Sequence, residues 1–105
     1  MQIKVNTDSN IQGDERLKEA VRAMVEQGLD HLVGRLTRIE VHLQDENAQK
    51  GGPDDIRCMI EARPEGMDPQ AVTHKDADVE AAVRGAARKL RGLLETGFGK
   101  LDSRR

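Results

Sequence analysis

The spacing of hydrophobic residues switches between two repeats along the chain, and these switches limit its fold more than any other feature of the sequence. Residues 1–6, 36–44 and 56–63 alternate apolar with polar side chains, which is the pattern of a strand with one buried face. Residues 14–34 and the segment from Asp76 onward place apolar side chains three and four residues apart, as in a helix with one buried stripe. The sequence therefore predicts strand, helix, strand, strand and finally helix.

A further short strand is predicted over residues 70–74, after a turn over residues 64–69. We expect the first helix to begin at Asp14, whose carboxylate can accept from free backbone N–H groups, and to end at Gly34 in a left-handed turn. In strand 36–44 the alternation predicts four residues on one face, and they are Thr37, Ile39, Val41 and Leu43.

The last helix has a broad apolar face, made of Val79, Ala82, Val83, Ala86, Ala87, Leu90, Leu93 and Leu94. Glycine is a poor helix former, so Gly97 and Gly99 predict that residues 97–105 are a frayed C-terminal tail.

Residues 45–55 combine acids and amides with Gly51, Gly52 and Pro53, and we expect a flexible acidic loop that joins two antiparallel strands. One apolar sheet face and two amphipathic helices are buried most simply when both helices pack side by side on that face. The predicted fold is α+β, a two-layer sandwich of order β-α-β-β-β-α with a four-stranded sheet. A chain of 105 residues is expected to form a single domain.

The composition argues against several classes of function. Phe98 is the only aromatic residue, so the aromatic platforms of many single-strand binders are absent from the sequence. The single Cys58 falls on an apolar strand face, which favours core packing and a reducing cytoplasm. The three histidines lack metal-ligand spacing, and the Gly51-Gly52 pair lacks a following Lys-Ser or Lys-Thr. We expect no enzyme activity, cofactor, metal, membrane span or small-molecule substrate.

One group of charges has the form of a binding surface. Arg84, Arg88 and Arg91 follow one another at four and three residues, so they share one face of the last helix, with Lys89 beside them. The alternative is an ordinary surface in which Glu80 pairs with Arg84 and Glu95 pairs with Arg91. Spacing alone does not decide between the two. Arg16, Lys18 and Arg22 could extend this basic ridge if the two helices lie side by side.

Three segments carry a resemblance to a known family. They are Met1-Gln2-Ile3-Lys4-Val5, Ile39-Glu40-Val41-His42-Leu43, and Asp78-Val79-Glu80-Ala81-Ala82-Val83 continuing to Lys89-Leu90. With the order of elements, they resemble the ribosome hibernation promoting factors, also called ribosome-associated translation inhibitors or ribosomal subunit interface proteins. The chain looks like the short form, because no C-terminal dimerisation extension follows the last helix. Glu80 and Arg84 stand where this family usually has Tyr and Asp.

The resemblance implies a fold similar to double-stranded RNA-binding domains and a non-enzymatic factor. Such a factor occupies the path of messenger and transfer RNA on the small ribosomal subunit, and inhibits translation or preserves idle ribosomes under stress. It also implies ribosomal RNA contacts, which on this chain would be Arg84, Arg88, Lys89 and Arg91, with Lys18 and Arg22 on the first helix. We expect a monomer away from the ribosome.

The net charge of −2 keeps a second hypothesis open. The same fold could bind a protein partner through the acidic loop and the polar sheet face, which would carry Arg38, Glu40, His42, Arg57 and Glu61. Release of counterions makes RNA affinity fall steeply with salt, whereas a mixed-charge protein contact changes less, so salt dependence separates the two hypotheses.

Overall fold

The computed structural model describes residues 1–47 and 55–103. Its elements follow the predicted order, with one additional short 3-10 helix, η1. They are β1 (Gln2–Thr7), α1 (Glu15–Leu29), η1 (Asp30–Arg35), β2 (Leu36–Asp45), β3 (Ile56–Pro64), β4 (Gln70–Asp76) and α2 (Val79–Asp102). The predicted α+β fold is confirmed.

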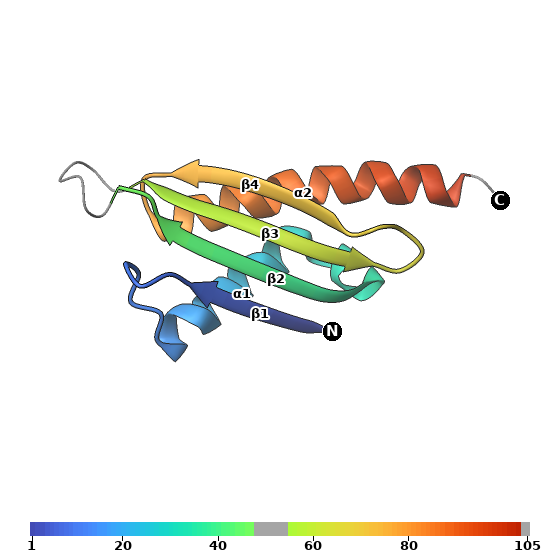
Figure 1. The fold of residues 1–105 in the computed structure, drawn as a ribbon. Coiled ribbons are helices and arrows are strands. Elements are labelled where there is room, and N and C mark those ends of the chain that lie inside the picture. Colours follow the sequence, from blue (N-terminus) through green and yellow to red (C-terminus); the bar gives the residue numbers. More distant parts are fainter. Residues whose placement is uncertain (48–54, 104–105) are drawn as a thin grey trace.

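The four strands form one sheet in the order β1-β2-β3-β4. β1 runs parallel to β2, with Ile3 opposite Ile39 and Val5 opposite Val41, while the other two pairs are antiparallel. Parallel neighbours need a crossover connection, and α1 provides it. Both helices lie behind the same face of the sheet (Figure 1), so the opposite face is open to solvent.

A single apolar layer joins the helices to the sheet. Ile39, Val41 and Ile60 of the sheet are fully buried, as are Val25 of α1 and Leu90 of α2. Asp14 and Asp78 cap the two helices: Asp14 Oδ1 accepts from the Leu17 N–H at 2.9 Å, and Asp78 Oδ1 accepts from the Ala81 N–H at 2.8 Å. These caps satisfy donors at the start of each helix, which is why the helices begin where they do.

At the start of β2, the residues on the buried face differ from the prediction. Thr37 is exposed and Leu36 is buried, because the register with β3 shifts between Leu36 and Arg38. An extra residue in one strand moves the side chains before it to the other face. The Thr37 hydroxyl donates to the Arg63 carbonyl oxygen at 3.0 Å, which secures the irregular pairing.

The first helix also ends earlier than predicted. The α-helix stops at Leu29, and Asp30, not Gly34, has the positive φ of 54°. The chain then tightens into η1, which buries Leu32 to 3% exposure. The apolar spacing in the sequence continues beyond the end of α1 because η1, a tighter helical segment, packs on the same core.

The last helix does not end where its glycines predicted. It continues through Gly97 and Gly99 to Asp102, so residues 97–102 are helical where we expected a frayed tail, and residues 104–105 lie outside the described range. Tertiary contacts explain this: Phe98 is 3% exposed, and the Arg35 guanidinium lies 3.8 Å from its ring centroid. Arg35 also donates twice to the Asp102 carboxylate, at 3.0 Å each.

Leu93 is a second correction on the last helix, because 41% of it is exposed although the pattern placed it on the buried face. It lies four residues after Lys89, which reaches the edge strand β4, so this flank of α2 faces the margin of the sheet. β4 is an outermost strand, so no strand of the described residues lies beyond it to cover Leu93.

Only the ends of the predicted acidic loop can be compared with the structure, since residues 48–54 lie outside the described range. Asp45 belongs to β2, opposite Ile56. The Glu46 N–H donates to the Asp55 carbonyl oxygen at 2.9 Å, so strand pairing continues into the predicted loop. The flexibility of this loop and the single-domain organisation stay predictions.

Candidate functional site

A groove of about 230 Å³ separates the outer surfaces of the two helices. α1 contributes apolar and amide groups to it, and α2 contributes only arginines. Its lining residues are Met24, Gln27, Gly28, Arg84, Arg88 and Arg91. The basic ridge predicted from the four-and-three spacing therefore stands along one wall of a groove. The floor residues on α1 were missed, because sequence spacing does not show how two helices are rotated against each other.

The three arginines of the groove differ in their partners. Arg84 Nε lies 3.1 Å from Glu80 Oε1, and Arg91 Nε lies 3.4 Å from Glu95 Oε1. Both pairs are solvent-exposed contacts between residues four apart on a helix, which typically contribute about 0.3–0.5 kcal/mol. Arg88 lies between them and makes no hydrogen bond or ion pair with any residue of the ranges 1–47 and 55–103. An incoming anion thus meets one unpaired guanidinium and two that are weakly held.

Lys89 does not point into this groove. Its Nζ donates to the backbone carbonyl oxygen of Thr73 at 3.1 Å, on the opposite flank of α2. Thr73 belongs to β4, an outermost strand of the sheet. Lys89 therefore binds a backbone carbonyl oxygen of an edge strand and does not take part in the groove.

The two basic candidates on α1 also lie away from the groove. Arg22 Nε donates to the Ile3 carbonyl oxygen of β1 at 3.2 Å, and its Nη1 lies 3.8 Å from Glu15 Oε2. Lys18 precedes Arg22 by four residues and shares its side of the helix. The helices do lie side by side, but Lys18 and Arg22 face the β1 margin of the molecule, so they do not extend the α2 ridge.

A family model matches most of the chain. Residues 6–101 match the family described as Sigma 54 modulation protein / S30EA ribosomal protein. The chain belongs to this family. The resemblance inferred from the three sequence segments is confirmed.

Solved structures share this fold at low sequence identity. A ribosomal subunit interface protein from Coxiella burnetii superposes with a TM-score of 0.77 at 11% identity, covering 94% of this chain and 99% of that one. The N-terminal domain of Thermus thermophilus Protein Y superposes with a TM-score of 0.73 at 20% identity, covering 91% and 98%. No curated protein sequence matches the chain.

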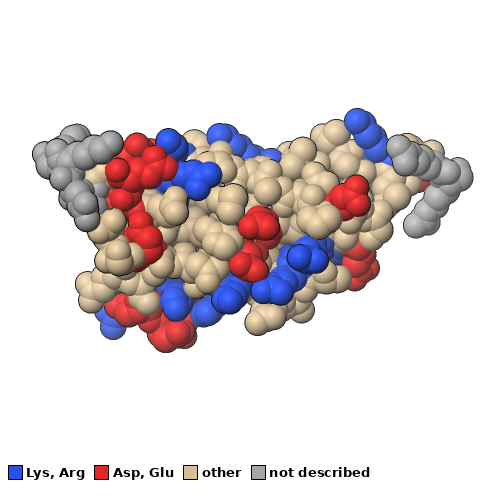
Figure 2. Space-filling model, viewed as in Figure 1, with Lys and Arg blue, Asp and Glu red and all other residues tan. Residues whose placement is uncertain are grey.

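The open face of the sheet carries a different arrangement of charge in this member of the S30EA family. Arg38 lies opposite Arg63, and Glu40 lies opposite Glu61, so two like-charged pairs face each other across β2 and β3. Directly opposed like charges destabilise a sheet unless other groups offset them. Figure 2 shows both signs on this face, with acidic atoms gathered toward the left end and a row of basic atoms along the lower middle.

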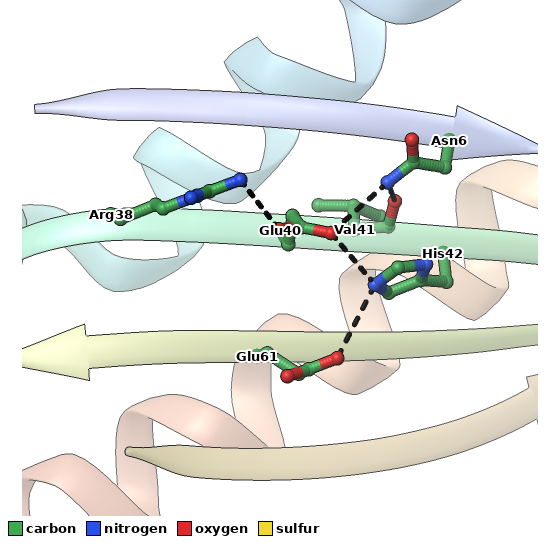
Figure 3. Close-up of polar contacts among 6 residues, drawn as sticks. All are labelled: Asn6, Arg38, Glu40, Val41, His42 and Glu61. Atoms are coloured by element: carbon green, nitrogen blue, oxygen red, sulfur yellow. Dashed lines mark hydrogen bonds and ion pairs between the residues drawn. The ribbon is translucent and has the colours of Figure 1, made fainter. Parts of the chain in front are cut away.

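Neighbouring side chains offset these like charges. Arg38 Nη2 donates to Glu40 Oε1 at 2.8 Å, and the Asn6 amide lies 3.5 Å from Glu40 Oε2. His42 Nε2 lies 3.3 Å from one oxygen of Glu40 and 3.3 Å from one of Glu61, between the two carboxylates (Figure 3). Neither contact has good hydrogen-bond geometry, and this nitrogen is shielded from solvent. Arg38, Glu40, His42 and Glu61 form one cluster on a polar face, in which His42 Nε2 has no hydrogen-bond partner among the described residues.

Apart from the His42 cluster, the cysteine and the other two histidines have ordinary surroundings. Burial raises the pKa of the Cys58 thiol to about 12, which leaves it protonated and unreactive. His31 and His74 each lie beside a carboxylate of their own segment, Asp30 at 3.5 Å and Asp76 at 3.2 Å. Within the described ranges, no group of three or more His, Cys, Asp or Glu residues is placed to hold a metal ion.

The length and hydropathy of the described helices can be compared with those of membrane-spanning helices. None of those described combines the length and apolar character that a bilayer crossing requires.

Proposed function

We propose that this chain is a non-enzymatic, cytoplasmic ribosome-binding factor. It occupies the messenger and transfer RNA path of the small ribosomal subunit, and thereby inhibits translation or preserves idle ribosomes under stress. The observation that carries the proposal is the groove between α1 and α2, with Arg84, Arg88 and Arg91 along one wall. The factor acts by steric occlusion, needs no cofactor and is a monomer away from the ribosome.

Phosphate recognition explains why this groove is the binding site. Arginine presents a planar, permanently charged fork that matches phosphate oxygens, and neutralising phosphates releases counterions. Arg88 can donate to a phosphate without first breaking an internal contact among the described residues. When a phosphate binds, Arg84 and Arg91 give up weak, exposed ion pairs with glutamates and gain charge-assisted hydrogen bonds to the phosphate oxygens. Lys18, Arg22 and Lys89 stay predictions as RNA contacts, and could meet RNA only at the flanks.

Membership of the S30EA family supports ribosome association. A structural neighbour that covers nearly the whole chain is a ribosomal subunit interface protein. Double-stranded RNA is recognised mainly by shape and backbone contacts, which requires no aromatic side chains. A chain whose only aromatic residue, Phe98, lies in the core fits that mode of binding.

Co-sedimentation with purified small subunits and with whole ribosomes, over a series of salt concentrations, tests the proposal. We expect sedimentation with small subunits at low salt and a linear fall of log affinity against log salt concentration. A protein that stays in the supernatant even at the lowest salt would refute ribosome binding.

The sheet face favours a second candidate function, binding of a protein partner. Its paired Arg38, Glu40, His42 and Glu61 suit a mixed-charge contact more than a phosphate backbone. Partner binding through this face would depend weakly on salt and would be unaffected by changes in the groove. The same salt series therefore separates the two functions.

A further inference from the structure

Gly28 of α1 lies in close contact with α2. A methyl group added at Gly28 would lie 2.8 Å from the Cβ of Ala87, which is nearer than two carbon atoms approach in a folded protein. Ala87 is 1% exposed, and its Cβ has no torsion by which it could move aside. The two helices therefore pack so tightly at this point that α1 requires a residue without a side chain.

This contact coincides with the middle of the arginine groove. Gly28 is itself a lining residue, and Ala87 directly precedes Arg88 and lies between Arg84 and Arg91 in the sequence. The three arginines project from α2 beside the contact, whereas Met24 and Gln27 approach from α1. A change in the distance between the helices would alter the width of the groove and the position of α1 relative to all three guanidinium groups.

We propose that Gly28 is a positioning residue for the binding site: its contact with Ala87 sets the helix spacing that keeps the arginine groove complementary to a phosphate backbone. This inference rests on the proposed function, because it names what maintains the site. Glycine is less favourable than alanine within a helix, so the sequence keeps a locally unfavourable residue at the position where the helices meet.

The chain supplies a matched control. Gly92 is also internal to a helix and lies next to Arg91, but a methyl group added there would meet no atom within 4 Å. Gly92→Ala therefore makes the same chemical change beside the same groove without altering the helix spacing. The reciprocal variant Gly28→Ala/Ala87→Gly moves the methyl group from α2 to α1 and restores the total volume at the contact.

The experiment measures binding to small ribosomal subunits over a salt series, at a temperature where thermal unfolding shows every variant to be folded. We expect Gly28→Ala to lower affinity by roughly tenfold and to make the salt dependence shallower, because fewer phosphates are neutralised at once. Gly28→Ala/Ala87→Gly should recover at least part of the affinity and of the salt dependence, and Gly92→Ala should match the wild type in both quantities. A merely structural role would lower the unfolding temperature of Gly28→Ala and leave the salt dependence of the folded protein unchanged.

Several outcomes would overturn the proposal. Wild-type affinity and salt dependence in folded Gly28→Ala would do so, as would a folded double variant that binds no better than Gly28→Ala. If Gly28→Ala does not fold, the double variant carries the test, and its folding without binding contradicts the inference. Retention on heparin, a generic polyanion, is measured in parallel. A wild type that binds heparin but not ribosomes refutes the proposed function. A folded Gly28→Ala that binds both heparin and ribosomes as the wild type does refutes the positioning role alone.

Discussion

The two solvent-exposed surfaces of this protein carry similar kinds of charge but use them differently. In the groove between the helices, Arg84, Arg88 and Arg91 share one wall, and their two acidic partners lie at its ends. On the open sheet face, bases meet acids directly, as in Arg38 with Glu40 at 2.8 Å. Glu46 contacts both Lys75 at 3.0 Å and Arg57 at 3.6 Å.

Whether charges are paired, more than how many there are, indicates where an anion binds. A net charge of −2 argues against nucleic-acid binding only if the charges are mixed uniformly. On the sheet face, Glu46 contacts Arg57 and Lys75, whereas in the groove Arg88 makes no hydrogen bond or ion pair with a described residue. The sheet face is thereby suited to stability and mixed-charge contacts, and the groove to phosphate.

The largest expected effect comes from reversing the charge of one surface at a time. Changing Arg84, Arg88 and Arg91 together to Glu should lower affinity for small subunits by at least about 100-fold at low salt, because three phosphate contacts become repulsive. Changing Arg38, Arg57 and Arg63 together to Glu gives the same change in net charge on the sheet face, and should lower affinity far less. Equal losses, measured by co-sedimentation, would mean that overall charge and not the groove determines binding.

A smaller effect is expected when truncations on the buried side of α2 and on its exposed flank are compared by their free energies of unfolding. Leu90→Ala removes a fully buried side chain below the groove, and we expect it to lower the free energy of unfolding by about 2–5 kcal/mol. Leu93→Ala makes the same change three residues later, where 41% of the side chain is exposed, and should cost less than about 1 kcal/mol. Urea denaturation followed by circular dichroism measures both. Comparable losses would show that the flank of α2 is covered in solution.

The smallest effect concerns pH and the sheet side of the molecule. A hydrogen bond from the Ala77 N–H, and a second one from His74, lower the pKa of Asp76. A carboxyl group with a lowered folded-state pKa stabilises the protein above its unfolded-state pKa, and this contribution is lost as the pH falls through the folded-state value. The stability difference between wild type and Asp76→Asn should therefore shrink on acidification, as followed by thermal unfolding. A difference that stays constant down to strongly acidic pH would contradict this assignment.

Much of the fold could be predicted because local patterns and burial agree. The alternation in residues 56–63 and the repeat from Val79 to Leu94 correspond to β3 and to most of α2. The failures occur where tertiary contacts override local preference. Phe98 and its contact with Arg35 keep the helix intact past Gly97, and a register shift at the start of β2 exposes Thr37.

The candidate site was predictable only in part. Four-and-three spacing was sufficient to place Arg84, Arg88 and Arg91 on one side of α2. It could not show that Lys89 reaches the Thr73 carbonyl or that Arg22 reaches the Ile3 carbonyl, because both partners are backbone atoms of strands distant in sequence. Nor could spacing show that Gly28 packs against Ala87, since that depends on helix rotation.

Ribosome binding as proposed depends on Arg88 of the groove, which has no partner among the described residues, contacting a phosphate on the ribosome. The most direct test compares the salt dependence of small-subunit binding for wild type and Arg88→Gln, a change that removes one charge without adding another. We expect Arg88→Gln to bind more weakly and to give a slope of log affinity against log salt that is shallower by about one unit or slightly less, as for one lost phosphate contact. An unchanged slope, with affinity equal to that of the wild type, would place ribosome binding elsewhere on the molecule.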